Sequence, residues 1–130
     1  MTGNILVVSN VSVSYGRVEA VRGVSLSIPA GGIVTVIGAN GAGKTTLLNA
    51  IMGVLPSTGE TVLDGRALGR RLVEDRVGEG LCLVPEKREL FATMSVEDNL
   101  RLGAYRLGSG AIADGLAGVF GRFPKLQERR

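Results

Sequence analysis

The sequence predicts an α/β fold that begins with antiparallel strands, and three local patterns support this prediction. Residues 5–15 and 18–28 alternate apolar with polar side chains, which is typical of strands that bury one face. Residues 33–37 form a nearly continuous β-branched run, which indicates a strand buried on both faces. A glycine-rich loop over 38–43 separates that run from a helical pattern over 44–52, so strand, loop and helix follow one another.

The boundaries of these elements can be read from turn residues. Residues 29–32 combine proline and glycine, and this turn separates the second strand from the β-branched run. The helix after the loop is expected to face its core with Leu47, Leu48 and Ile51. Gly53 should end that helix, because glycine readily adopts the left-handed conformation of a C-terminal cap.

Further elements are expected in the second half of the chain. Residues 60–63 predict a short strand, and 81–84 predict another buried strand that stops before a proline. Ser95 is expected to cap a helix, with Asp98 three residues later completing a capping box. Residues 112–123 have helical spacing of apolar side chains, although three glycines weaken this helix.

The composition is that of a globular protein. The chain has 130 residues, 45% of them hydrophobic and 21% charged, so we expect one domain with a real core. The net charge of +3 is modest, and no dense basic stripe with interleaved aromatic residues is visible. Direct nucleic-acid binding is therefore not predicted.

The single cysteine and the N-terminus suggest an intracellular, soluble chain. Cys82 has no cysteine partner within the chain, which fits a reducing cytosol, and its apolar neighbours predict that it is buried. Residues 1–4 lack the basic region of a signal peptide, and the apolar run 5–8 is too short for one. No run approaches the roughly 20 apolar residues of a membrane span. Any link to a membrane is expected to run through a partner.

The strongest motif is a phosphate-binding loop. Its residues fit the pattern G-x-x-x-x-G-K-[ST] at every defined position: Gly38, Ala39, Asn40, Gly41, Ala42, Gly43, Lys44 and Thr45. Glycines let the backbone curl so that successive N–H groups point at phosphate oxygens. The helix that starts at Lys44 adds the positive end of its dipole.

The motif assigns a task to each polar side chain that follows the loop. Lys44 is expected to reach the β- and γ-phosphates, and the Thr45 hydroxyl to ligate Mg²⁺. Thr46 can add a contact near the α-phosphate. The motif alone leaves kinases, GTPases, transport ATPases and DNA-repair ATPases open.

Several longer segments narrow this choice. They resemble the ATP-binding subunits of branched-chain amino-acid ABC importers over nearly the whole chain. The matching segments are GGIVTVIGANGAGKTTLL (31–48), LVPE (83–86), RELF (88–91), MSVEDNL (94–100), FPKL (123–126) and ERR (128–130). The phosphate loop is shared by the superfamily, whereas the stretch 85–100 carries the resemblance to this subfamily.

The resemblance implies two further site residues. Tyr15 stands where ABC ATPases place an aromatic residue that stacks on adenine; the alternative is an ordinary aromatic residue of the strand core. Glu86 stands at the position of the Q-loop glutamine, which touches Mg²⁺ or the attacking water, and this subfamily usually has glutamate there. A carboxylate adds negative charge beside the triphosphate, so the alternative is an exposed carboxylate at a strand end.

The family also has motifs that this sequence lacks. It contains no Leu-Ser-Gly-Gly signature, no apolar strand ending in Asp-Glu (Walker B) and no histidine for the switch position. In the family all three lie downstream, so residues 1–130 are expected to form a partial nucleotide-binding domain with an incomplete α/β P-loop core. Alone it should bind ATP weakly at best and should not turn it over.

The resemblance implies a function for the full-length protein. It is expected to be an ATPase subunit that uses ATP and Mg²⁺ to energise import of branched-chain or related amino acids. Its implied partners are membrane permease subunits, an identical or paralogous ATPase subunit and, indirectly, a periplasmic binding protein, which places it on the cytoplasmic face of the cell membrane. Two alternatives are an ATP-binding module without enzymatic activity and an ABC ATPase for DNA or another cargo.

Overall fold

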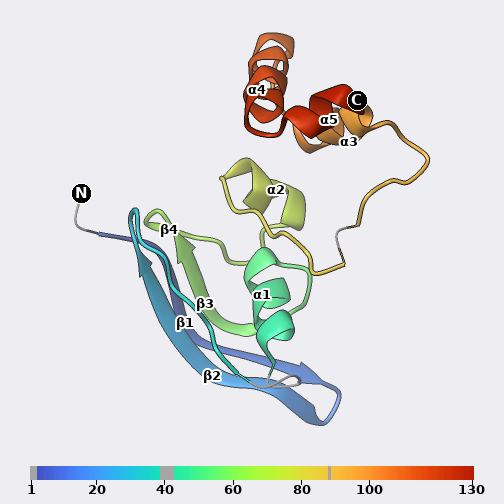
Figure 1. The fold of residues 1–130 in the computed structure, drawn as a ribbon. Coiled ribbons are helices and arrows are strands. Elements are labelled where there is room, and N and C mark those ends of the chain that lie inside the picture. Colours follow the sequence, from blue (N-terminus) through green and yellow to red (C-terminus); the bar gives the residue numbers. More distant parts are fainter. Residues whose placement is uncertain (1–2, 39–42, 88) are drawn as a thin grey trace. The chain divides into compact units, whose positions relative to one another are not determined.

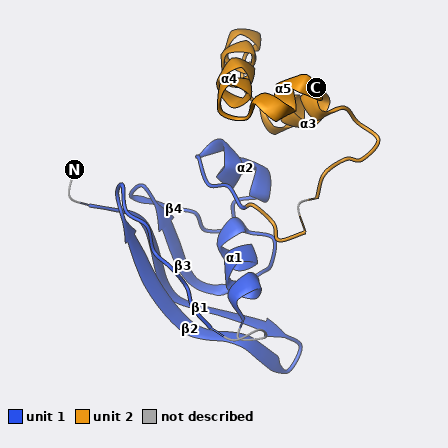
Figure 2. Cartoon of the chain, in the orientation of Figure 1, with its two compact units in different colours: residues 1–83 blue, residues 84–130 orange. Residues whose placement is uncertain are grey.

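The computed structural model describes residues 3–38, 43–87 and 89–130, and the chain divides into two compact units (Figures 1 and 2). Unit 1 comprises Met1–Leu83 and unit 2 comprises Val84–Arg130. Unit 1 holds a sheet and the helices α1 (Lys44–Met52) and α2 (Val73–Gly78). In unit 2, the described residues form helices and loops.

The sheet of unit 1 is antiparallel throughout. The two 12-residue strands β1 (Asn4–Tyr15) and β2 (Val18–Pro29) form a long hairpin, which confirms the predicted N-terminal antiparallel strands. The strand β3 (Thr58–Leu63) pairs with the other edge of β1, and the two-residue strand β4 (Arg66–Ala67) pairs with β3. The strand order is therefore β2-β1-β3-β4 (Figure 1).

A bulge in β1 keeps its apolar side chains on one face. Leu6 and Val8 are buried at even positions, whereas Val11 and Val13 are buried at odd positions. The change of phase occurs where the pairing register shifts, at Asn10, whose φ is 54°. An extra residue in one strand inverts the alternation beyond it, so both halves of β1 face the same core.

Helix α1 packs on this core. Leu47, Ala50 and Ile51 are buried and form one cluster with the apolar residues of β1. The helix spans the predicted residues and ends at Gly53, whose φ of 84° is the expected left-handed cap. The prediction for Leu48 is wrong, because its side chain is exposed.

Two predicted strands are absent. Residues 33–37 and 81–84 have no strand conformation, and Ile33, Ile37 and Val84 are 95%, 89% and 86% exposed. A strand needs a neighbour to take up its N–H and C=O groups, and within the described residues no strand pairs with either run. The predicted burial of Cys82 is wrong for the same reason, since the thiol lies in the second run and is exposed.

Unit 2 contains the helices α3 (Val96–Gly103), α4 (Ser109–Arg122) and α5 (Pro124–Glu128). The predicted cap of α3 is confirmed, because the Ser95 hydroxyl oxygen accepts a hydrogen bond from the Asp98 N–H at 3.0 Å. The predicted helix over 112–123 forms as α4 and buries Leu116 and Phe120. Within the described part of the chain, every helix is too short or too polar to cross a membrane.

Candidate nucleotide-binding site

Gly43 closes the phosphate loop against the β-hairpin. Its φ is 90°, a conformation that side chains rarely adopt, and a Cβ atom there would lie 2.7 Å from the carbonyl oxygen of Ala20. Only glycine fits both the backbone conformation and this close approach. Four residues predicted to belong to the loop, Ala39, Asn40, Gly41 and Ala42, lie outside the described residues.

Helix α1 begins directly after this glycine, with the first helical hydrogen bond from the Leu47 N–H to the Gly43 carbonyl at 2.8 Å. No side chain caps this end of the helix, and its first turn carries no acidic residue. The N–H groups of the first turn and the positive end of the helix dipole therefore have no acidic partner within that turn. This end of α1 suits a phosphate group.

Lys44 contacts the residue at the start of the loop. Its ammonium group donates a hydrogen bond to the carbonyl oxygen of Gly38, so the two ends of the loop are joined by this side chain. The next residue, Thr45, is exposed at the start of α1. A cation and a hydroxyl thus stand at the helix end that suits an anion, and these residue types fit a triphosphate with its magnesium ion.

Tyr15 is outside the core. It is the last residue of β1 and is 51% exposed, although Val11 and Val13 on the same strand are buried. Its hydroxyl lies 3.5 Å from the Thr46 hydroxyl oxygen on α1. Two predicted site residues that are 31 positions apart in the sequence therefore lie side by side.

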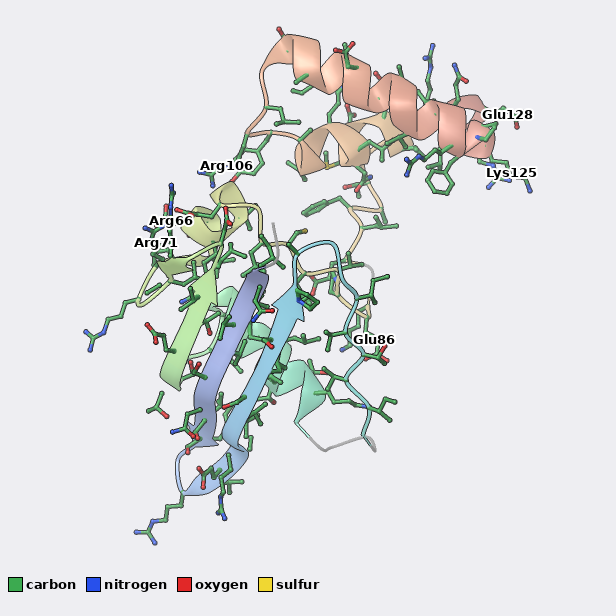
Figure 3. The ribbon with its side chains drawn as sticks, turned by 90° about the vertical axis from the view of Figure 1, so that its left-hand side faces the viewer. Arg66, Arg71, Glu86, Arg106, Lys125 and Glu128 are labelled. Atoms are coloured by element: carbon green, nitrogen blue, oxygen red, sulfur yellow. The ribbon has the colours of Figure 1, made fainter. Side chains whose placement is uncertain are left out.

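Glu86 lies in unit 2, in an exposed turn that follows Pro85 (Figure 3). The expected strand before it is absent, so Glu86 is not at a strand end. Its exposure agrees with the alternative interpretation, an exposed carboxylate, and its role at the nucleotide stays a prediction.

The opposite end of α1 is held by a buried arginine that the sequence did not single out. The Arg76 guanidinium donates to the carbonyl oxygens of Ile51 at 2.7 Å, Gly69 at 2.9 Å and Arg71 at 3.0 Å. Burial lowers the pKa of Arg76 from its usual value, yet an arginine stays charged at neutral pH. The guanidinium thus binds the negative end of the α1 dipole.

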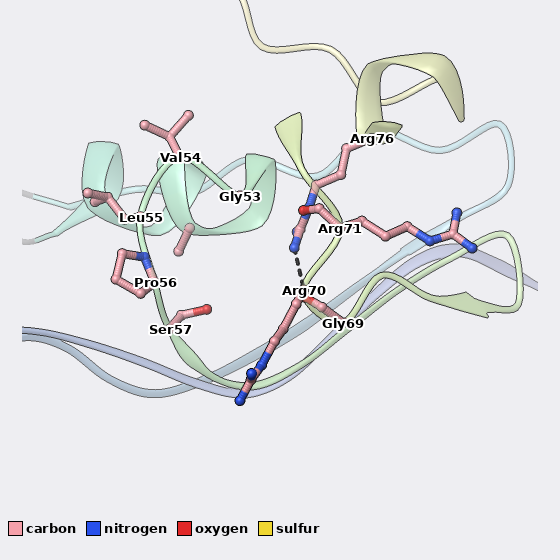
Figure 4. A pocket seen from close by; sticks show the side chains of 10 residues that line it. Gly53, Val54, Leu55, Pro56, Ser57, Gly69, Arg70, Arg71 and Arg76 are labelled. Carbon is pink, nitrogen blue, oxygen red and sulfur yellow. Dashed lines mark hydrogen bonds between the residues drawn. The ribbon is translucent and has the colours of Figure 1, made fainter. Parts of the chain in front are cut away.

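Arg76 also borders a pocket of about 500 Å³ (Figure 4). The side chains of Arg70 and Arg71 diverge from one another in this pocket, and Arg71 instead pairs with Glu79. Arg66 reaches the same carboxylate at 3.8 Å, beside Arg71 (Figure 3). The pocket therefore lacks the convergent charges of an anion site. The sequence could not identify Arg76 as buried. Helix α2 is too short to show an apolar pattern, and the carbonyl groups that Arg76 contacts are 25, 7 and 5 residues away.

Comparison with known sequences identifies a family. A family model described as ABC transporter matches residues 21–129. The high-affinity branched-chain amino acid transport ATP-binding protein BraG of Pseudomonas aeruginosa is 35% identical over 92% of this chain and 52% of its own length. The Fe(3+) ions import ATP-binding protein FbpC of Escherichia coli K12 is 33% identical over 81% of this chain and 30% of its own length. A ribose import ATP-binding protein, RbsA 2 of Escherichia coli O157:H7, is also 33% identical, over 77% of this chain and 20% of its own length.

Solved structures agree with the sequence comparison. The ATP binding subunit of an ABC transporter matches 96% of this chain with a TM-score of 0.81 and 26% identity, over 52% of its own length. A nucleotide-free ATP-binding cassette matches 78% of the chain with a TM-score of 0.69 and 28% identity, over 40% of its own length. These likenesses confirm the predicted fold class, a partial ABC ATPase fold of α/β type. The chain spans about half the length of BraG and less of the other two curated relatives. Because the family model covers most of the chain and a relative matches it over nearly all of its length, the chain belongs to the ABC transporter family.

Proposed function

We propose that this chain binds ATP at the start of α1 and forms part of an ATPase subunit that energises an ABC importer. The observation that supports the proposal is the geometry at the point where the phosphate loop ends and α1 begins. Gly43 is packed against the Ala20 carbonyl, and α1 starts there without an internal acidic group. Because the chain belongs to the ABC transporter family, we infer that the anion bound at this helix end is the phosphate group of ATP. The relatives are named as transport or import ATP-binding proteins.

In this proposal each residue of the loop has one task. The N–H groups of 38–43 surround the phosphates, and Lys44 leaves the Gly38 carbonyl to pair with the β- and γ-phosphate oxygens. The Thr45 hydroxyl holds Mg²⁺, and Thr46 contacts the α-phosphate. The magnesium ion, when bound, neutralises charge on the phosphate oxygens.

Two residues outside the loop are also assigned roles, Tyr15 within unit 1 and, by the resemblance alone, Glu86 of unit 2. Tyr15 offers an exposed ring beside Thr46, which suits stacking on the adenine base. Glu86 is assigned to the Q-loop position, where a carboxylate would orient water or reach the metal ion through water. Direct contact with the metal is less favourable, because the carboxylate brings negative charge close to the triphosphate.

We propose branched-chain or related amino acids as the cargo. BraG matches 92% of this chain, compared with 77% and 81% for the ribose and iron relatives at similar identity. The partners that follow are membrane permease subunits, a second identical or paralogous ATPase subunit and, indirectly, a periplasmic binding protein. With these partners the protein would lie on the cytoplasmic face of the cell membrane.

A second candidate function is ATP binding without turnover. The sequence favours it, because residues 1–130 contain no histidine for the switch position and no apolar strand ending in Asp-Glu. We assign hydrolysis to the full-length protein only, where residues beyond this chain can supply a catalytic base.

Uptake of radiolabelled cargo by cells that carry the gene with Lys44→Ala tests the importer proposal. Each charge-assisted contact to phosphate contributes roughly 1.5–3 kcal/mol, so leucine uptake should fall to the level of a gene deletion. Lys125→Ala is the matched control, because Lys125 is exposed on α5 and should leave uptake unchanged. Loss of ribose or iron uptake instead would contradict the amino-acid assignment, and normal uptake of all three would contradict the importer.

A further inference from the structure

Two serines hold a matched pair of bulges in the hairpin of β1 and β2. The register makes Asn10 an extra residue of β1 opposite Ser25, and it makes Gly23 an extra residue of β2 opposite Ser12. Asn10 and Gly23 both have left-handed backbones, with φ of 54° and 55°. The Ser25 hydroxyl accepts a hydrogen bond from the Asn10 N–H at 2.8 Å. The Ser12 hydroxyl accepts one from the Gly23 N–H, also at 2.8 Å. Each serine thus takes up an N–H group that a bulge removes from the ladder.

The two bulges differ in their other support. The Asn10 bulge is enclosed on both sides, because β1 also pairs with β3 and that register shifts at the same point. A Cβ atom at Gly59 of β3 would lie 2.4 Å from the Asn10 carbonyl oxygen, so β3 packs closely on this bulge. Gly23 instead lies on β2, which is an edge strand of the sheet and is paired with β1 (Figure 1). The Gly23 bulge therefore depends on β1 and on the Ser12 hydroxyl that β1 provides.

The part of β2 beyond the Gly23 bulge reaches the start of α1. A further register shift makes Ala20 another extra residue of β2. A Cβ atom at Gly43 would lie 2.7 Å from the Ala20 carbonyl oxygen and 3.2 Å from the Val21 side chain. Gly43 is thus packed on a segment that lies a few residues from the bulge. Because a slip of one residue moves a strand by about 3.3 Å, it would displace the Ala20 carbonyl from Gly43.

We propose that Ser12 is a positioning residue for ATP, which acts on the end of the phosphate loop through the bulge at Gly23. The inference rests on the proposed function, which supplies ATP as the ligand. The Ser12 hydroxyl fixes the register of β2, and β2 supports Gly43 at the point where α1 begins. N–H groups that are already ordered bind a phosphate more tightly, because less conformational entropy is lost on binding. Ser12 therefore affects phosphate binding without touching the nucleotide.

The test uses variants of the purified ATPase subunit that contains this chain. Ser12→Ala removes the hydroxyl, and Ser12→Thr keeps it on a side chain that suits a strand. Ser25→Ala is the matched control, because it removes a bond of equal length at the bulge that β3 also supports. Gly23→Ala strains the same bulge from the other strand, since φ there is 55° and the new Cβ atom would lie 3.1 Å from Asn10 Oδ1. Titration with a fluorescent ATP analogue measures ATP affinity, and competition measures the affinity for inorganic triphosphate, which lacks the base.

We expect Ser12→Ala to weaken the binding of both ligands about fivefold or more, which is within the range of one lost hydrogen bond. Gly23→Ala should weaken both in the same way, so the inference can be tested even where Ser12→Ala does not fold. Ser12→Thr and Ser25→Ala should stay within about twofold of wild type, because each leaves the Gly23 bulge supported. The melting temperatures of the two serine-to-alanine variants should fall by similar amounts, since each loses one bond to a hydroxyl. Hydrogen exchange of the Gly23 amide should accelerate in Ser12→Ala and not in Ser25→Ala.

Failure of the inference and failure of the proposed function give different results. If Lys44→Ala loses ATP affinity while Ser12→Ala and Gly23→Ala keep it, the ATP site stands and the role of Ser12 is overturned. Equal losses of affinity in Ser12→Ala and Ser25→Ala would also overturn it, because general weakening of the hairpin would explain both. Loss of ATP affinity with unchanged triphosphate affinity would overturn it too, since the defect would then lie at the base. If the wild-type subunit binds no ATP, or Lys44→Ala binds it as tightly, the proposed ATP site fails and the inference with it.

Discussion

Tyr15 and Val13 share one phase of alternation on β1, yet they differ in their surroundings. Val13 is 2% exposed, whereas Tyr15 is 51% exposed at the end of the hairpin, paired with Val18. The alternation predicts on which face of the sheet a side chain lies. It does not predict how far along the strand other segments pack on that face and bury it. Tyr15 therefore lies at the edge of the core, 3.5 Å from the Thr46 hydroxyl, and its stacking on adenine stays a prediction.

Tyr15→Ala should therefore weaken ATP binding by about 1–2 kcal/mol, the usual contribution of stacking between a base and an aromatic ring. Tyr15→Trp should spare it, because any flat aromatic ring can stack on adenine. Equilibrium titration with a fluorescent ATP analogue measures both variants. A fall in thermal stability with unchanged ATP affinity in Tyr15→Ala would show that the ring serves the fold alone.

At the scale of elements, α1 is held at both ends by contacts with other segments. Its first residue follows Gly43, which is closed against β2, and its last turn is held by Arg76 from α2. Gly53 leaves room for that guanidinium, because a Cβ atom there would lie 2.7 Å from Arg76 Nε. The buried arginine thus links α1, α2 and the turn at Gly69.

Arg76→Met should lower the free energy of unfolding by at least about 4 kcal/mol, because it removes three hydrogen bonds from a charged group, worth about 1.5–3 kcal/mol each, and leaves their carbonyl acceptors without this donor. Arg71→Met is the control, since its ion pair with Glu79 lies at the surface and should cost at most about 1 kcal/mol. Urea denaturation of the subunit that contains this chain measures both. Equal losses would mean that the Arg76 contacts contribute no more than a surface pair.

At the scale of the whole chain, the apolar runs 33–37 and 81–84 determine how the chain behaves alone. A strand of a parallel sheet is stable only between neighbours that cover both faces and pair both edges. Here Ile33, Ile37 and Val84 are largely exposed, so each of these uncovered side chains forgoes roughly 1.5–3 kcal/mol of burial. Several such side chains rival the stability of an ordinary domain, which is about 5–15 kcal/mol.

We therefore expect the purified 130-residue chain to aggregate or to remain partly molten, and its ATPase rate to equal the blank without enzyme. Phosphoryl transfer depends on groups that are positioned together, and the chain contains no histidine and no Walker B carboxylate. A malachite-green phosphate assay with the wild type and Lys44→Ala measures the rate. Steady turnover that disappears in Lys44→Ala would contradict the prediction and would show that the chain carries its own catalytic base.

The sequence by itself determined the features that depend on near neighbours. The phosphate-loop motif, the limits of α1, the cap from Ser95 to Asp98 and the antiparallel hairpin all arise from residues a few positions apart or from one short turn. The tertiary structure alone decided the burial of Arg76 and the exposure of Tyr15. It also decided that the β-branched run 33–37 forms no strand. These outcomes depend on which distant segments cover a side chain or pair with a backbone, and local periodicity carries no information about such partners.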